Sequence, residues 1–215
     1  MLWIAHRGYS IDFRDNSVEA IREAVRRGYH GVEIDVQLCK TGEIVLHHDV
    51  YFGDAFVKDM TLDQLDELGV VSLRDVYVEI PEMEHTMVLL DIKGGDHAII
   101  EALRMFYMHR STRLVTFCSF NRGILFNLPY GFMRGSTFET TFNVDEYDVI
   151  TRGLSAVVVH WTCLSHTFIT HCRTKDIRIY TYTHKESMEL EYMYKYNVDG
   201  IITNGGIPTS LLQKS

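Results

Sequence analysis

The chain has 215 residues, of which 46% are hydrophobic and 23% are charged, a balance typical of a folded globular protein and unlike that of a disordered chain. Acidic residues outnumber lysine and arginine by 29 to 21, and the resulting formal charge of −8 disfavours a general nucleic-acid-binding surface. The longest apolar runs, such as residues 156–159, are too short to cross a bilayer.

Short β-rich runs alternate with amphipathic helical stretches along the whole chain. The first run, residues 2–6, precedes a helix that Asn16-Ser17 can cap and that stops at Gly28. A strand at 31–38 is followed by a turn at 40–42 and a return strand at 43–48. The other expected strands are 87–92, 113–118, 130–135, 155–160, 177–182 and 200–203. The other expected helices are 61–68, 72–78, 98–108, 121–127, 144–152, 164–172 and 186–196, before a tail at 209–213.

The alternation indicates successive βαβ units and therefore a parallel sheet. If 43–48 is the return arm of a hairpin, eight strands remain with a helix in each interval, which is the count of a (β/α)8 TIM barrel. We expect a compact α/β barrel forming one domain over residues 1–215. An open doubly wound sheet is the main alternative, although no glycine-rich phosphate loop follows the first strand.

Charged residues are concentrated at the expected ends of the strands, where a TIM barrel has its active site. Glu33 and Asp35 are two residues apart, so on a strand both side chains point to the same face. Asp91 and Lys93 repeat this spacing on the next parallel strand. Three carboxylates facing inward require a compensating cation, and oxygen ligands suit Mg²⁺ or Ca²⁺ rather than zinc. The spacing therefore predicts a metal site formed by Glu33, Asp35 and Asp91.

Several short motifs resemble those of the glycerophosphodiester phosphodiesterase family, a group of TIM-barrel enzymes. They are His6-Arg7-Gly8, Asp15-Asn16-Ser17, Gly31-Val32-Glu33-Ile34-Asp35-Val36, Lys40-Thr41-Gly42, His48-Asp49, Ser119-Phe120 and Val198-Asp199-Gly200-Ile201-Ile202-Thr203-Asn204. The motifs extend over nearly the whole chain. The resemblance implies a metal-dependent phosphodiesterase that releases an alcohol and sn-glycerol 3-phosphate.

One position and one four-residue segment depart from the family pattern. Asp91 stands where the family usually has a glutamate, and Tyr182-Thr183-His184-Lys185 replaces the family's W-T-V-N. An aspartate at position 91 is similar to the sphingomyelinase D and phospholipase D toxins, so a lysophospholipase D-like lipid phosphodiesterase is one alternative. A barrel that binds a phosphate headgroup without hydrolysing it is the other.

The resemblance also suggests roles for the charged residues. His6 and His48 become the acid–base pair, because imidazole titrates near neutral pH. The choice of His48 over its neighbour His47 depends on the family's H-D pairing. Arg7 and Lys93 would bind the non-bridging phosphoryl oxygens. Which histidine is the acid, and whether water or a substrate hydroxyl attacks first, stay open from the sequence.

Mg²⁺ is expected in preference to Ca²⁺, because Mg²⁺ retains bound waters that can bridge to the short Asp91 side chain. His160 is a candidate substrate contact at the end of its strand, and Asn16 either holds the first loop near the metal or caps the helix.

The composition of the chain also bears on its partners and its cellular location. The four cysteines have no metal-ligand spacing, so we expect reduced thiols and a cytoplasmic protein. The expected partner is a small phosphodiester, with no nucleic acid and no stable membrane insertion, and the sequence does not define an oligomeric state.

Overall fold

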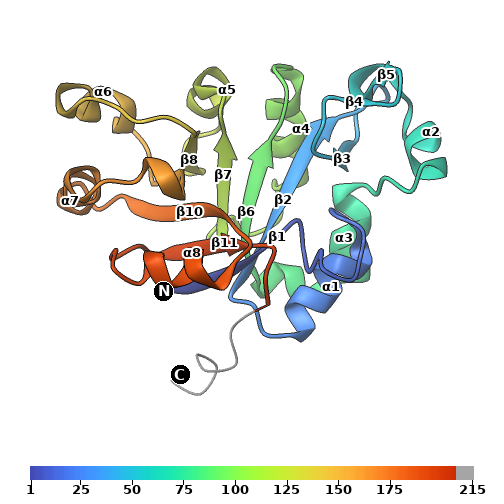
Figure 1. Cartoon of the computed structure of the whole chain (residues 1–215). Coiled ribbons are helices and arrows are strands. Elements are labelled where there is room, and N and C mark those ends of the chain that lie inside the picture. Colours follow the sequence, from blue (N-terminus) through green and yellow to red (C-terminus); the bar gives the residue numbers. More distant parts are fainter. Residues whose placement is uncertain (207–215) are drawn as a thin grey trace.

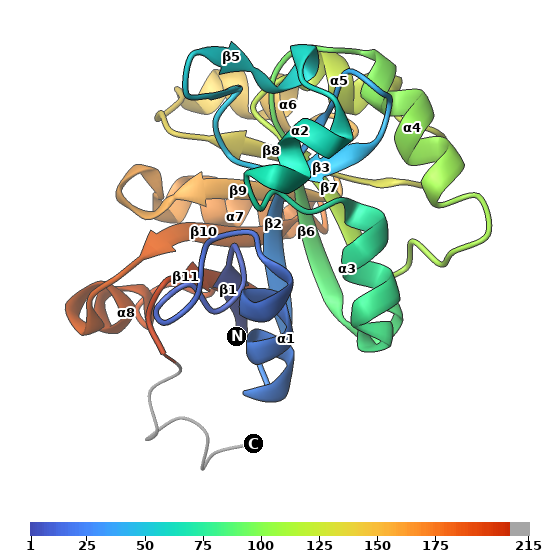
Figure 2. The same ribbon diagram turned by 90° about the vertical axis from the view of Figure 1, so that its right-hand side faces the viewer.

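Eight parallel strands close into a barrel in the computed structural model, which describes residues 1–206 (Figures 1 and 2). In barrel order they are β1 (Leu2–His6), β2 (Gly31–Leu38), β6 (Met87–Ile92), β7 (Val115–Ser119), β8 (Met133–Phe138), β9 (Ala156–His160), β10 (Arg178–His184) and β11 (Gly200–Thr203). The barrel closes because β1 pairs in parallel with both β2 and β11. The expected TIM barrel is confirmed, and the alternative of an open doubly wound sheet is wrong.

Helices lie outside the strands, as Figure 1 shows. They are α1 (Val18–Arg26), α2 (Leu62–Glu67), α3 (Leu73–Glu79), α4 (Ala98–Phe106), α5 (Arg122–Asn127), α6 (Tyr147–Thr151), α7 (His166–Thr174) and α8 (Ser187–Met193). The first of them begins where the sequence indicates, because the Ala20 amide donates a hydrogen bond to Ser17 Oγ at 3.1 Å.

Strand residues alternate between two buried apolar layers. Ile34, Val36 and Ile92 belong to the large layer between the strands and the helices. A smaller cluster inside the barrel contains Ile4, Leu89, Cys118, Ala156, Val158, Tyr180 and Ile202. Because successive side chains of a strand point to opposite faces, the outward direction of Ile34 and Val36 turns Glu33 and Asp35 into the barrel.

Short elements between the strands account for most differences from the expected structure. β3 (Ile44–Leu46) is the return strand and pairs antiparallel with β2, but the hairpin of β4 (Tyr51–Phe52) and β5 (Ala55–Phe56) was not expected. Short 3-10 helices occur at Val57–Asp59, Pro81–His85, Val144–Glu146 and Trp161–Cys163. The expected tail at 209–213 lies outside the described residues.

The fifth barrel strand was expected three residues too early, at 130–135 instead of Met133–Phe138. Gly135, Ser136 and Thr137 give this strand little of the apolar character of the others. Glycine at position 135 has a packing reason, since a Cβ there would lie 2.9 Å from the Cys118 sulfur of the adjacent strand.

The cysteines are free, as expected: Cys39, Cys118 and Cys172 are buried and Cys163 is half-buried. Within residues 1–206, none of the helices combines the length and the apolar composition needed to cross a membrane.

Candidate active site

A cavity of about 410 Å³ opens at the carboxyl ends of the strands. Its lining includes all seven residues that the sequence suggested as site residues: His6, Arg7, Glu33, Asp35, His48, Asp91 and Lys93. The remaining lining residues are Leu89, Cys118, Phe120, Thr137, Glu139, Val158, Tyr182, Thr183 and Ile202. The volume lies within the range of about 300–1,000 Å³ that is usual for small-molecule sites.

The strand register brings the three carboxylates together. Asp35 on β2 is directly opposite Asp91 on β6, and His6 on β1 is opposite Glu33. One carboxylate oxygen from each of Glu33, Asp35 and Asp91 lies within 4.8 Å of the others, and all three residues are buried. The shorter side chain of Asp91 therefore still reaches the cluster.

Two cations share this space with the three carboxylates. Lys93 Nζ lies 2.5 Å from Asp91 Oδ2 and 3.0 Å from Asp35 Oδ1, and Arg7 Nε lies 3.0 Å from Asp35 Oδ2. Although burial alone would raise it, the pKa of Asp35 is lowered because Lys93 and Arg7 outweigh that effect.

The other two carboxyl groups are poorly compensated. Burial raises the pKa of Glu33 well above its ordinary value, and the neighbouring Asp35 and Asp91 raise it further. Burial also raises the pKa of Asp91 despite the Lys93 contact. Three carboxylates against two cations leave an excess negative charge in a buried site, which a proton or a further cation must neutralise.

The donor set fits a hard divalent cation. All three groups offer oxygen ligands, and Asp91 Oδ1 is buried without a hydrogen-bond partner among the described residues. Together with the uncompensated charge, this unpaired oxygen indicates that Glu33, Asp35 and Asp91 can bind a metal ion.

The loop after β1 folds back over α1 and positions its own polar groups. Arg7 and Gly8 both have positive φ angles, of 57° and 81°, and a Cβ on Gly8 would lie 2.6 Å from the Ala20 carbonyl carbon. Farther along this loop, Asn16 Nδ2 donates to Asp35 Oδ2 at 2.8 Å, and the Asp35 amide donates to Asn16 Oδ1 at 3.1 Å. Asn16 therefore orients Asp35, and the alternative that it caps the helix is wrong because Ser17 is the cap.

The two candidate histidines have different surroundings. His6 Nδ1 lies 2.5 Å from Asn204 Oδ1, and burial followed by the Arg7 charge lowers its pKa to about 4. His6 is therefore neutral near pH 7. His48 is 44% exposed, and its Nδ1 lies 2.8 Å from Asp49 Oδ1. His47 is outside the cavity lining, with Nε2 3.2 Å from the Tyr51 carbonyl oxygen and its ring 5.1 Å from that of Phe52.

Asn204 is a site residue that the sequence reasoning did not single out. It follows β11, so its contact with His6 joins residues 198 positions apart and exists only in the closed barrel. The His184 carbonyl accepts hydrogen bonds from the Asn204 amide at 3.0 Å and from Thr203 Oγ1 at 2.9 Å. The backbone at His184 thus supports the residue that orients His6. The expected substrate contact of His160 stays a prediction; its ring packs edge-on against Tyr182 at 5.5 Å and does not line the cavity.

His184 makes stability depend on pH. The side chain is fully buried, its Nε2 lies 2.9 Å from Thr181 Oγ1, and burial lowers its pKa from 6.5 to about 4. Between these values the unfolded chain binds a proton that the folded chain does not, so the free energy of unfolding decreases as the pH falls, by about 3 kcal/mol from this group. Above pH 6.5 its contribution is constant.

Urea unfolding from neutral pH down to about pH 4 measures this dependence, with His184→Gln as the comparison. We expect a shallower decrease in the variant. An equal pH slope in the two proteins would contradict the assignment to His184.

Comparison with known proteins supports the resemblance. Residues 6–101 match the model of the glycerophosphoryl diester phosphodiesterase family. A glycerophosphodiester phosphodiesterase of Caldanaerobacter subterraneus is 24% identical over 94% of this chain and 93% of its own length. Human glycerophosphodiester phosphodiesterase 1 is 32% identical, but the match covers only 49% of this chain and 38% of the human protein.

Solved structures share the fold. A glycerophosphodiester phosphodiesterase from Thermotoga maritima superposes with a TM-score of 0.83 at 23% identity, covering 95% of this chain and 94% of that one. An Oleispira antarctica phosphodiesterase in complex with its product sn-glycerol-3-phosphate also has a TM-score of 0.83, at 19% identity, over 95% of this chain and 93% of that one. The family-model match includes all seven expected site residues. Four of them lie on β1, β2 and β6, Arg7 and Lys93 directly follow β1 and β6, and His48 follows β3. The chain is therefore similar to the glycerophosphoryl diester phosphodiesterase family in sequence over residues 6–101, and it shares the fold of the solved phosphodiesterases over nearly its whole length.

Proposed function

We propose that this protein hydrolyses glycerophosphodiesters to an alcohol and sn-glycerol 3-phosphate. The observation that carries the proposal is the convergence of two histidines, two cations and three carboxylates on one cavity at the barrel mouth. The Caldanaerobacter relative, similar over nearly its full length, and the product-bound Oleispira structure support this choice of substrate.

Hydrolysis breaks the bond between phosphorus and the alcohol oxygen and forms a new one to the attacking oxygen. Arg7 and Lys93 hold the non-bridging phosphoryl oxygens, Arg7 through its planar guanidinium and Lys93 as a point charge. Their contacts with Asp35 and Asp91 fix both cations beside the metal ligands. A metal ion on Glu33, Asp35 and Asp91 would act as a Lewis acid and offset the negative charge of the phosphoryl group.

We assign the general base to His6 and the general acid to His48. His6 is neutral near pH 7 because burial and Arg7 lower its pKa to about 4, and its Nδ1 is taken by Asn204. Its Nε2 can therefore accept the proton of the attacking hydroxyl group. His48 is more accessible to solvent and lies against the Asp49 carboxylate, which orients the ring. It is placed to donate a proton to the leaving alkoxide.

The metal we propose is Mg²⁺. Three side chains supply fewer protein oxygens than Ca²⁺ usually takes, whereas Mg²⁺ is bound through few carboxylates and retains several waters. We further propose that residues 1–215 act as one domain in the cytoplasm, because the four cysteines are free and disulfides are rare in that compartment.

A substrate panel tests the activity. We expect release of glycerol 3-phosphate from glycerophosphocholine and glycerophosphoethanolamine, and slower hydrolysis of lysophospholipids in vesicles, because the chain carries a net charge of −8 that disfavours anionic membranes. Faster hydrolysis of lysophospholipids would favour the lysophospholipase D-like alternative. Binding of the diesters without turnover would favour the non-catalytic barrel.

A further inference from the structure

The cavity has two chemically different halves. The strands β1, β2 and β6 and the loop after β3 supply the histidines, cations and carboxylates described above. On the other side, Phe120 follows β7, Glu139 follows β8, and Tyr182 lies on β10. Because both halves line one cavity, a substrate whose phosphate occupies the first half has space for an ester substituent in the second.

Glu139 is the free charge of the second half. It is exposed, and it has no hydrogen bond or ion pair with any of residues 1–206. The cations of the first half do not neutralise it, because Arg7 and Lys93 contact Asp35 and Asp91 instead. Its charge is felt by Tyr182, whose pKa is raised by burial first and by Glu139 next.

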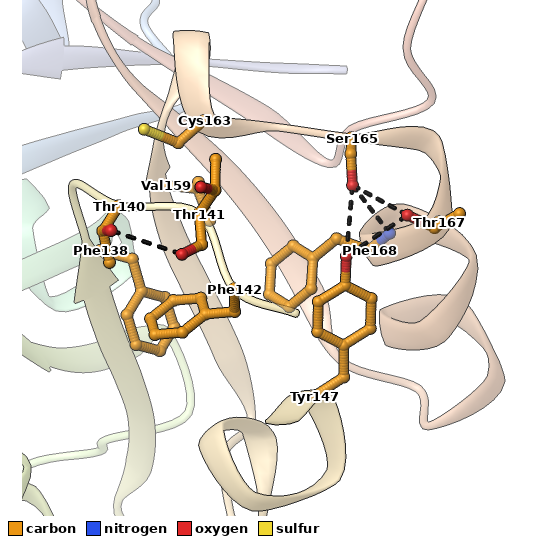
Figure 3. A pocket seen from close by; sticks show the side chains of 10 residues that line it. All are labelled: Phe138, Thr140, Thr141, Phe142, Tyr147, Val159, Cys163, Ser165, Thr167 and Phe168. Atoms are coloured by element: carbon orange, nitrogen blue, oxygen red, sulfur yellow. Dashed lines mark hydrogen bonds between the residues drawn. The ribbon is translucent and has the colours of Figure 1, made fainter. Parts of the chain in front are cut away.

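The backbone direction at the end of β8 places Glu139 at this cavity. Its neighbour Phe138 faces a second, smaller cavity of about 260 Å³, where its ring packs edge-on against Phe142 at 5.1 Å (Figure 3). The described lining of that second cavity contains no charged residue, and the hydroxyl groups of Tyr147, Ser165 and Thr167 lie within hydrogen-bonding distance of one another. Of these two cavities, the one that Glu139 lines therefore offers a carboxylate to a cationic ligand group, and the one that Phe138 lines does not.

Two aromatic rings line the same half of the cavity as Glu139. The ring centroids of Phe120 and Tyr182 are 6.4 Å apart and nearly perpendicular, at 88°. Tyr182 is held in place because its hydroxyl donates to the Phe138 carbonyl at 3.1 Å and its ring packs against His160. Phe120 is 52% exposed and lines the cavity, so its ring is accessible to a ligand there.

We propose that Phe120, Glu139 and Tyr182 form a subsite for the alcohol part of the substrate and that this subsite takes cationic amino alcohols, such as choline and ethanolamine. An alkylammonium group is attracted both to aromatic rings and to a carboxylate, whereas a neutral polyol is not. The inference rests on the proposed function and adds to it a preference among diesters that share the same glycerol 3-phosphate half.

The test is the ratio of kcat/KM on a substrate with a cationic alcohol part to kcat/KM on a substrate with a neutral alcohol part. Glycerophosphocholine and glycerophosphoethanolamine carry the cationic alcohols, and glycerophosphoglycerol and glycerophosphoinositol carry the neutral ones. We expect a ratio above one for the wild type and a roughly tenfold lower ratio for Glu139→Gln, which preserves shape and removes the charge. Phe120→Leu should lower the ratio for choline by a few-fold, because it keeps apolar volume and removes the aromatic ring.

Glu82→Gln is the matched control. Glu82 is an exposed glutamate in the 3-10 helix Pro81–His85 and does not line the cavity, so this variant should keep the wild-type ratio. A ratio unchanged by Glu139→Gln, or an equal loss on all four substrates, overturns the subsite and leaves the phosphodiesterase standing. No hydrolysis of any of the four overturns the proposed function and the subsite with it.

Discussion

Replacing His6 with glutamine is expected to lower kcat by about 10²–10⁴-fold, and His48→Gln should have an effect of the same order. Glutamine can keep a hydrogen bond to Asn204 or Asp49, but it cannot transfer a proton near neutral pH. Both histidines line the cavity, and Asn204 and Asp49 fix their ring nitrogens at 2.5 Å and 2.8 Å. The measurement is steady-state hydrolysis of glycerophosphocholine.

The neighbouring His47 provides the control, because it lies next to His48 in sequence but outside the cavity lining. His47→Gln should retain nearly wild-type kcat, and thermal unfolding of all three variants shows whether each is folded. A folded His6→Gln enzyme with kcat close to wild type would remove His6 from the reaction. A large loss in His47→Gln alone would reverse the assignment between the two adjacent histidines.

Removing the metal is expected to abolish most of the activity. Glu33, Asp35 and Asp91 each place an oxygen within 4.8 Å of the others, and the two neighbouring cations leave part of their negative charge uncompensated. We expect chelation to lower the rate by at least ~10²-fold, and added Mg²⁺ to restore it better than Ca²⁺. Asp91→Asn should lose activity to a similar extent, because it removes a charged ligand.

Asp91→Glu tests the reach of this ligand. The extra methylene moves the carboxylate by about 1–1.5 Å, and misplacement on this scale can cost ~10²-fold, so we expect reduced but measurable activity. Asp66→Asn, at an exposed aspartate on α2, is the control for removal of a surface charge. If thorough chelation leaves the wild type fully active, or if Asp91→Asn equals wild type, Asp91 is not a metal ligand.

Local sequence patterns predicted most of the barrel, because the side-chain period of a strand is a property of the chain itself. Glu33 and Asp35 alternate with Ile34 and Val36, and one face had to be buried against helices. The same pattern was weak in β8, where Ser136 and Thr137 are buried although neither is a large apolar residue. Its position was therefore misjudged by three residues.

The supporting contacts of the site could not be read from local patterns. Asn16 holds Asp35 and Asn204 holds His6, and each pair is distant in sequence, by 19 and 198 residues. An asparagine before a helix looks like a cap whether or not it reaches another strand. Likewise, the two cations of the cavity, Arg7 and Lys93, contact Asp35 and do not pair with Glu139. Only the three-dimensional structure shows these contacts.

The link between His6 and Asn204 spans the seam at which β1 meets β11, the first and last strands of the barrel. His6 therefore gains the partner that fixes its ring only when β11 has paired with β1. Orientation of the histidine that we propose as the base is thus coupled to closure of the barrel, and a partly folded chain in which this seam is open has no oriented His6.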